Sequence, residues 1–220
     1  MSKYDKQAHL TQIHNNLVEM YIPKRYRSAT LDQVDDPKIR AWAADPSPDA
    51  EVRAAEVAAS ESAQPSWRPE GVLYLCGEFG TGKTFAAWAV VNDYLWHPIT
   101  NTTSISCFYG GLTATLLESM MPGCVRDDDR GTIRDPIIRA MKTPLLLLDD
   151  LGGHKPSEWR EETIFKIIDY RYNEEKPTIV TSNLAPNEIG DVVGGKVASR
   201  LAEDATIVAL NGEDRRRSAA

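Results

Sequence analysis

Short apolar runs alternate with longer stretches of helical periodicity from residue 71 to residue 210. The run at 145–149 holds four leucines in succession before an acid, and such unbroken apolarity indicates a strand buried on both faces. Strands are predicted at 72–76, 104–109, 145–149, 178–181 and 205–210. Helices are predicted between them, at 85–96, 112–121, 132–142, 157–172 and 191–202. This alternation is typical of an α/β fold in which helices cross over a parallel sheet.

The segment before the first strand has its own pattern. A short amphipathic helix is predicted over 3–20, where apolar residues recur at spacings of three and four, at Leu10, Ile13, Leu17 and Met20. Its apolar stripe would pack on the rest of the chain or dock a partner. Pro23 favours an extended lead-in over 21–31, and the stretch 49–60 is rich in strong helix formers.

Length and charge narrow the class of protein. The 220 residues suit one domain with a core of its own, and the formal net charge of -7 argues against a protein that coats nucleic acid through a broad basic face. We expect a helix at 1–20, one domain at 21–217 and a disordered tail at 218–220.

Cysteine usage and hydropathy point to a cytoplasmic protein. Cys76, Cys107 and Cys124 have no C-x-x-C spacing, so neither a disulfide framework nor a zinc site is indicated. Cys76 and Cys107 lie in strand-like runs and are interpreted as small core residues. The sequence has no apolar signal-peptide core and no run of about 20 apolar residues that could span a membrane.

A glycine-rich turn after the first predicted strand carries the most specific signal. Residues 77–84 fit the phosphate-binding pattern G-x-x-x-x-G-K-[ST] at every fixed position. Its glycines permit positive φ, so the backbone can wrap around phosphate oxygens, and the N-terminus of the next helix attracts the same anion. A tight turn without a ligand is the alternative. The predicted binding residues are Gly77, Glu78, Phe79, Gly80, Thr81, Gly82, Lys83, Thr84 and Phe85.

Two acids at the end of a later strand complete a nucleotide site of the kind that binds ATP with Mg²⁺. Lys83 would pair with the β- and γ-phosphates, and the Thr84 hydroxyl would bind Mg²⁺. Asp149 and Asp150 follow the apolar run at 145–148, which is the Walker B arrangement. Asp149 would hold Mg²⁺ and Asp150 would orient the attacking water, unless both acids are merely solvated.

Two further residues are candidates for catalysis. Asn183 follows the strand at 178–181, where its amide could hydrogen-bond the γ-phosphate or the attacking water, although a Ser-Asn pair after a strand is commonly a turn. Arg200 lies on a predicted helix and is either a surface charge or an arginine finger that reaches the γ-phosphate of a neighbouring subunit.

Three segments carry a resemblance to a known family. They are LLLLDDLGGHKPSEW at 145–159, RYNEEKPTIVTSNL at 171–184 and ASRLAED at 198–204. Together with the glycine-rich loop they resemble the DnaC/DnaI-type replicative helicase loaders, an AAA+ group that includes the IstB transposition helpers. The resemblance covers about residues 21–217. It implies a P-loop three-layer α/β fold with a five-stranded parallel sheet and no C-terminal helical lid.

The resemblance also implies roles and partners. Lys83 and Thr84 would bind phosphate and Mg²⁺, Asp149 the metal, Asn183 would be sensor 1 and Arg200 the finger. The protein would be an ATPase that assembles with copies of itself and places a DnaB-type replicative helicase on single-stranded DNA.

The sequence departs from the loader pattern in two places that matter for function. The second acid is Asp150 where most AAA+ proteins have Glu, and the shorter side chain predicts slow, switch-like hydrolysis. Only about twenty residues precede the matching region, where loaders carry a helicase-binding domain. Without a lid, one of the arginines at 215–217 would contact the phosphates.

The resemblance further implies single-stranded DNA contacts in the segment after the second predicted strand. The cations there are Arg126, Arg130, Arg134, Arg139 and Lys142. Acids are interspersed at 127–129 and 135, so a solvated charged surface is the alternative.

Two other functions use the same motifs. An IstB-like helper would act on a transposase. The other alternative is a plain nucleotide-dependent binding module or a small-molecule kinase that uses the same loop, and a kinase would need a lid and an acceptor pocket that the sequence does not indicate.

Overall fold

The computed structural model describes residues 3–44, 69–96, 136–153, 157–203 and 205–212. By its internal contacts the chain divides into two compact units. The first comprises Met1–Pro69 and Trp88–Phe108, and the second comprises Glu70–Ala87 and Tyr109–Ala220. None of the described helices combines the length and apolarity that a membrane crossing requires.

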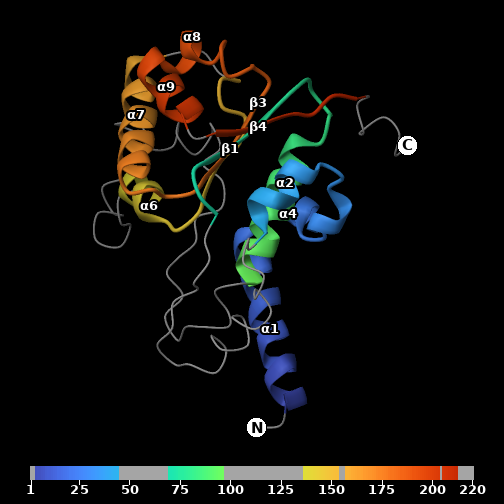
Figure 1. Cartoon of the computed structure of the whole chain (residues 1–220). Coiled ribbons are helices and arrows are strands. Elements are labelled where there is room, and N and C mark those ends of the chain that lie inside the picture. The colour runs from blue at the N-terminus through green and yellow to red at the C-terminus, as the bar shows by residue number, and fades with distance from the viewer. Residues whose placement is uncertain (1–2, 45–68, 97–135, 154–156, 204, 213–220) are drawn as a thin grey trace. The chain divides into compact units, whose positions relative to one another are not determined.

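The second unit is built on a parallel sheet. Its described strands are β1 (Val72–Cys76), β2 (Leu146–Leu148), β3 (Thr178–Ser182) and β4 (Ala205–Ala209), in the order β2-β3-β1-β4 (Figure 1). Every ladder between them is parallel, which confirms the predicted sheet type. The four described strands fall one short of the predicted five because the strand expected at 104–109 lies outside the described residues.

The register of the sheet brings three loop segments to one edge. Cys76 at the end of β1 is opposite Ser182 on β3, and Leu148 at the end of β2 is opposite Val180. The residues that follow β1, β2 and β3 therefore leave the sheet at the same edge, as strands of a parallel sheet require. These are the glycine-rich loop, the acidic pair and Asn183.

Four helices of the second unit lie together on one side of its strands (Figure 1). They are α6 (Pro136–Lys142), α7 (Glu158–Asn173), α8 (Gly190–Val193) and α9 (Gly195–Glu203). Ser157 caps α7, with its hydroxyl accepting from the Arg160 N–H at 3.3 Å, and Glu158 and Glu161 lie in the first turn, as predicted. The helix expected at 191–202 was wrong in one respect, because Gly194 has φ 88 and separates α8 from α9.

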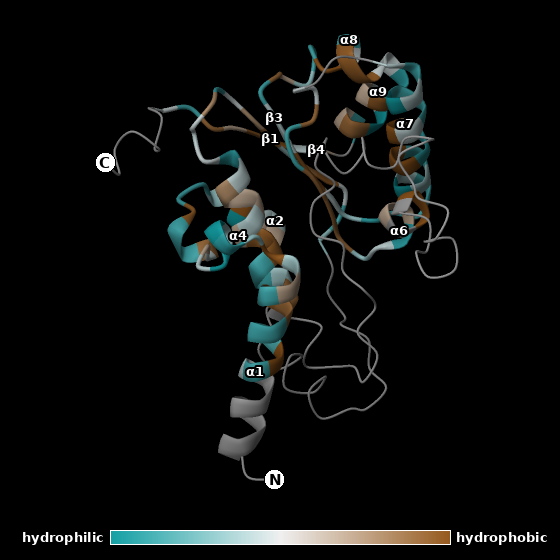
Figure 2. Cartoon of the chain, turned by 180° about the vertical axis from the view of Figure 1, so that it is seen from behind, coloured by the Kyte–Doolittle hydropathy of each residue, from teal (hydrophilic) through white to brown (hydrophobic). Residues whose placement is uncertain are grey.

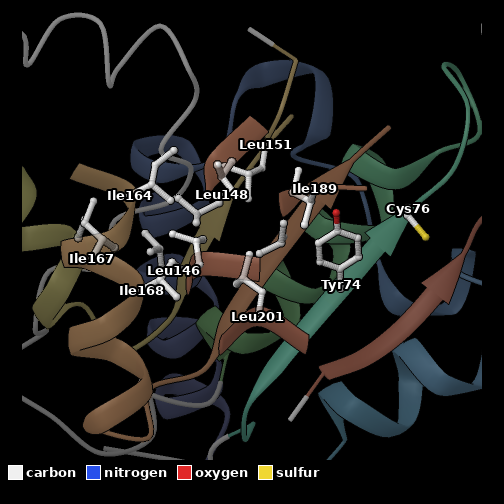
Figure 3. Packing of buried hydrophobic residues seen from close by; sticks show 14 residues of the cluster. Tyr74, Cys76, Leu146, Leu148, Leu151, Ile164, Ile167, Ile168, Ile189 and Leu201 are labelled. Atoms are coloured by element: carbon white, nitrogen blue, oxygen red, sulfur yellow. The ribbon is translucent and has the colours of Figure 1, made fainter. Parts of the chain in front are cut away.

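A cluster of buried side chains joins this helical layer to the sheet. Tyr74 and Cys76 come from β1, and the isoleucines of α7 meet the leucines of β2 (Figure 3). Burial raises the pKa of the Tyr74 phenol to about 12 and also raises the pKa of the Cys76 thiol. The neutral phenol donates a 3.0 Å hydrogen bond to the Leu184 carbonyl, which anchors the turn after β3. Cys76 is a core residue as predicted; Cys107 and Cys124 lie outside the described residues.

A buried arginine holds the start of two strands. Arg171 of α7 is 1% exposed, and its guanidinium donates to the carbonyl oxygens of Ala140, Thr143 and Pro177 and to the Thr178 hydroxyl at 2.6–2.9 Å. Its fork of donors therefore satisfies carbonyls at the end of α6 and before β2 and β3. This side chain is structural.

In the first unit the N-terminal helix α1 (Lys3–Tyr21) has a different buried stripe from the one predicted. Leu17 and Val18 are buried, whereas Met20 is 71% exposed. Met20 lies three residues after Leu17, on the flank of the helix that solvent reaches, so its inclusion in the apolar face was wrong. The coloured part of the helix carries both hydrophilic and hydrophobic residues (Figure 2).

The lead-in after α1 is not extended as predicted. It forms 3₁₀ turns at Lys24–Tyr26 and Leu31–Gln33, followed by α2 (Pro37–Ala43). The Asp36 carboxylate caps α2 by accepting from the Lys38 N–H at 2.8 Å, a helix-start signal that the sequence contained. The stretch 49–60 lies outside the described residues.

Helix α4 (Lys83–Trp96) starts in the second unit and continues into the first. In the first unit Trp88 stacks with Tyr26 at a centroid distance of 6.3 Å, and the Asn92 amide donates to the Ala29 carbonyl at 2.8 Å. These contacts fix the lead-in against the second half of α4.

Candidate functional site

The glycine-rich loop adopts the backbone that the phosphate-binding pattern demands. Gly77, Gly80 and Gly82 have φ of 136°, 80° and 96°, which confirms the prediction of positive φ at each. The buried Thr81 hydroxyl donates to the Glu78 carbonyl at 2.9 Å and closes the loop on itself. Phe79 stands at the tip with 72% of its surface exposed.

Gly77 is also required by its neighbours. A Cβ at this position would overlap with the Leu210 carbonyl oxygen just after β4. The Leu210 N–H donates to the Cys76 carbonyl at 2.8 Å, so the chain after β4 is tied to the entrance of the loop.

Lys83 lies inside the curve of the loop. It is 8% exposed, and its ammonium group donates to the Gly77 and Glu78 carbonyl oxygens at 2.7 and 2.6 Å. These two hydrogen bonds hold the positive charge of Lys83 at the place where the loop backbone and the N-terminus of α4 would bind an anion. Phe85 follows in the first turn of α4 and is half-buried.

Asp149 is placed beside the first turn of α4. Its Oδ1 accepts hydrogen bonds from the hydroxyls of Thr84 at 2.9 Å and Thr181 at 2.7 Å. The two motifs predicted from separate parts of the sequence therefore meet in one site. Thr181 was not among the predicted site residues.

This arrangement fits a magnesium ion. Because Thr84 donates its one hydroxyl proton to Asp149, its oxygen lone pairs remain to face a cation. Among the described residues no hydrogen bond reaches Asp149 Oδ2, which leaves that oxygen for the same cation or its water. Among the described residues no group of three or more His, Cys, Asp or Glu side chains is placed to hold a metal ion. Mg²⁺ commonly binds through one or two carboxylates and keeps waters and phosphate oxygens as its other ligands.

Asp150 has an unusual backbone that directs its side chain. Its φ of 58° lies in the left-handed region, and its N–H donates to the Thr181 hydroxyl at 2.8 Å. Its carboxylate accepts from the Asn183 amide at 3.2 Å, which places both predicted catalytic groups side by side. The amide orientation follows from this hydrogen bond.

Gly153 leaves the space that the Asp150 carboxylate occupies. A Cβ at Gly153 would overlap with that carboxylate, and the Gly153 N–H donates to the Asp150 carbonyl at 3.2 Å. The backbone at Gly153 therefore packs closely against the Asp150 side chain.

We expect Gly153→Ala to displace the Asp150 carboxylate while the fold and the nucleotide affinity are kept. The atoms that the new Cβ would overlap belong to the end of the Asp150 side chain, which can rotate away. Turnover should fall about tenfold or more, as for loss of a positioned catalytic group. Steady-state phosphate release would measure this. Gly195→Ala is the matched control, since a Cβ there meets nothing within 4 Å. Unchanged turnover in Gly153→Ala would contradict a role for this carboxylate geometry.

Arg200 lies apart from these groups. It is on α9 and forms an ion pair with Asp169 of α7, and its guanidinium lies 5.5 Å from the ring centroids of Phe165 and Tyr172. Its side chain keeps 30% of its surface exposed. The structure thus brings together Lys83, Thr84, Asp149, Asp150 and Asn183. Arg200 lies on the helical layer instead, a position compatible with both a surface charge and a finger that acts on another subunit.

The expected DNA contacts fall largely outside the described residues. Lys142 is exposed at the end of α6, and the side chains of the other four cations are not described. The arginines at 215–217 also lie outside the described residues.

The chain matches one protein family over most of its length. Residues 67–219 match the model of the IstB-like ATP binding proteins. Two curated relatives come from Bacillus subtilis (strain 168). The replicative helicase loader DnaI is 27% identical over 157 residues, which cover 66% of this chain and 47% of the relative. The uncharacterized protein YqaM is 28% identical over 125 residues, which cover 54% of this chain and 36% of the relative.

Solved structures share the fold. A crystal structure of DnaI superposes with a TM-score of 0.57 at 23% identity and covers 89% of this chain and 95% of its own. The DnaC helicase loader gives 0.56 at 23% identity, covering 86% and 100%. AMPPCP-bound DnaA from Aquifex aeolicus gives 0.56 at 22% identity, covering 90% and 53%. These likenesses confirm the expected α/β AAA+ fold with a parallel sheet. The chain spans about half or less of the length of its curated relatives.

Proposed function

Because the chain belongs to the family of IstB-like ATP-binding proteins, we propose that it binds ATP with Mg²⁺, hydrolyses it slowly, and loads a replicative helicase onto single-stranded DNA. The observation that carries this proposal is the meeting of the phosphate loop and the acidic pair, through the 2.9 Å hydrogen bond between Thr84 and Asp149.

Different residues of the proposed site bind the triphosphate and the magnesium ion. The loop backbone and the Lys83 ammonium bind the triphosphate, and Lys83 exchanges its loop carbonyls for phosphate oxygens. Thr84 and Asp149 hold Mg²⁺. A bound Mg²⁺ supplies positive charge that offsets the charge developing on the transferred phosphoryl group.

Asp150 and Asn183 handle the attacking water. The Asp150 carboxylate accepts a hydrogen bond from the water and orients it in line with the γ-phosphate, and the Asn183 amide holds that carboxylate without adding charge. Because an aspartate is one methylene shorter than the usual glutamate, the water is held less closely. Slow hydrolysis suits a protein that switches between two states rather than one that drives continuous motion.

Assembly would complete the site. In an ATP-bound oligomer, ring or spiral, Arg200 of one subunit would reach the γ-phosphate of the next and stabilise transition-state charge. The partial exposure of Arg200 on α9 supports this role, since 30% of its side-chain surface remains exposed although it is paired with Asp169.

The partner is proposed from the relatives. The names of DnaI and the DnaC helicase loader refer to helicase loading, and a DnaB-type helicase in the cytoplasm is the corresponding partner. The alternative is a transposase, because the matching family is described as IstB-like. No observation favours the kinase.

Co-purification separates the two partners. We expect the N-terminally tagged chain to retain the replicative helicase of its own genome with ATP and to retain less with ADP or no nucleotide. Lys83→Ala, which lacks the phosphate-binding ammonium, is the control for nucleotide dependence. Retention of a transposase and no retention of the helicase under any condition would replace the loader by the transposition helper.

A further inference from the structure

Thr181 holds the three residues that follow β2. It is 1% exposed and lies next to the last residue of β3. The β2–β3 ladder ends at the pair Leu148 and Val180, one position before it. Its hydroxyl donates to Asp149 Oδ1 at 2.7 Å and accepts from the Asp150 N–H at 2.8 Å, and its carbonyl accepts from the Leu151 N–H at 2.8 Å. Thr181 therefore supplies the hydrogen bonds to residues 149–151, beyond the end of the β2–β3 ladder.

The hydroxyl uses its hydrogen-bonding capacity on both acids. A threonine hydroxyl has one proton and two lone pairs. The proton goes to the carboxylate of Asp149, and a lone pair receives the backbone N–H of Asp150. The second bond supports the left-handed φ of 58° at Asp150, a conformation that few non-glycine residues adopt.

The Asp149 carboxylate is oriented from two sides. Thr84 on α4 and Thr181 on β3 donate to the same oxygen, Oδ1, so rotation of the carboxylate would break two hydrogen bonds at once. Without Thr181, one donor remains and Oδ2 loses its fixed direction. Groups that orient a metal ligand in this way commonly change metal affinity about 10- to 100-fold when removed.

We propose that Thr181 is a positioning residue that sets the metal-facing oxygen of Asp149 and the backbone turn of Asp150 through one hydroxyl. This inference rests on the proposed function, since it needs a nucleotide bound with Mg²⁺. In this proposal Thr181 contacts neither the phosphates nor the metal. It connects Asp149, which would bind the metal, to Asp150, which would orient the attacking water.

Two substitutions and a control on the same strand separate this role from plain stability. Thr181→Val keeps the shape and removes the hydroxyl, and Thr181→Ser returns it. Thr178→Val is the control, because Thr178 is also buried on β3 and its hydroxyl accepts from Arg171 at 2.9 Å, at the end of the strand away from the acids.

Affinity for a fluorescent ATP analogue is measured with Mg²⁺ and with EDTA, together with a Mg²⁺ titration. We expect Thr181→Val to weaken the Mg²⁺-dependent binding about tenfold or more while binding in EDTA changes less than about twofold. Thr181→Ser should restore the Mg²⁺ response, and Thr178→Val should keep it even if its unfolding temperature falls.

Several results would overturn the inference: an unchanged Mg²⁺ response in Thr181→Val, an equal loss in EDTA, or the same loss in Thr178→Val. Thr181→Ala is tested in parallel, and if both it and Thr181→Val lose the circular dichroism of the folded chain, the role is structural and the inference is wrong. A wild-type chain that binds no nucleotide would instead refute the proposed function itself.

Discussion

Replacing Lys83 by alanine is expected to lower the affinity for ATP about 100-fold or more while the fold is kept. The ammonium group is almost completely buried and already donates two hydrogen bonds at the loop, so its charge is directed at the place where phosphate would bind. A charge-assisted hydrogen bond contributes about 1.5–3 kcal/mol, and several phosphate contacts share this one group. Titration with a fluorescent ATP analogue measures the change.

Lys38→Ala is the matched control for this substitution. Lys38 is exposed on α2 in the first unit, so the same loss of charge occurs away from the loop. Thermal unfolding monitored by circular dichroism shows whether either variant loses the fold. Wild-type affinity in a folded Lys83→Ala variant would refute the assignment of the loop as the nucleotide site.

Arg200→Ala is expected to abolish most ATP hydrolysis without loss of ATP binding. An arginine finger is worth about 10³- to 10⁵-fold in rate, and a slow enzyme without it should fall to about the background rate. The cost in stability should be small, because the partly exposed ion pair with Asp169 is worth about 0–1 kcal/mol. Phosphate release and analogue binding, measured on the same sample, separate the two effects.

Mixing variants tests whether Arg200 acts on another subunit. Arg200→Ala binds ATP but lacks the finger, and Lys83→Ala supplies the finger but lacks the phosphate ligand. Recovery of hydrolysis in the mixture is expected only if the arginine of one subunit serves the nucleotide of the next. Lys196→Ala is the control, since Lys196 is an exposed cation one turn earlier on α9, 5.8 Å from the same Phe165 ring. Equal activity of Arg200→Ala and wild type would show that Arg200 is a surface charge.

The parts of the site that follow from local rules could be predicted from the sequence. Positive φ at Gly77, Gly80 and Gly82 follows from the loop pattern, and the leucine run before Asp149 identifies a buried strand. The parallel sheet then brings the two motifs to one edge, because residues after parallel strands leave in the same direction. The proximity of Asn183 to Asp150 follows from the same rule.

Features set by three-dimensional neighbours could not be predicted. In the sequence Thr181 is only the last residue of a predicted strand, and it is the β2–β3 register that places it opposite Asp149. Helix periodicity continued across Gly194, whose φ of 88° breaks the helix. Met20 fits an apolar stripe by spacing, yet the buried face of α1 is set by what packs against it, and Val18 lies there instead.

The way β4 ends has a practical consequence. Leu210 closes against the entrance of the phosphate loop through its hydrogen bond to Cys76, and only a glycine at position 77 leaves it room. A group inserted directly after Leu210 would therefore begin beside the loop that we propose to bind the nucleotide. A bulky insertion directly after Leu210 is therefore expected to hinder nucleotide entry at the proposed site without altering any residue of the loop.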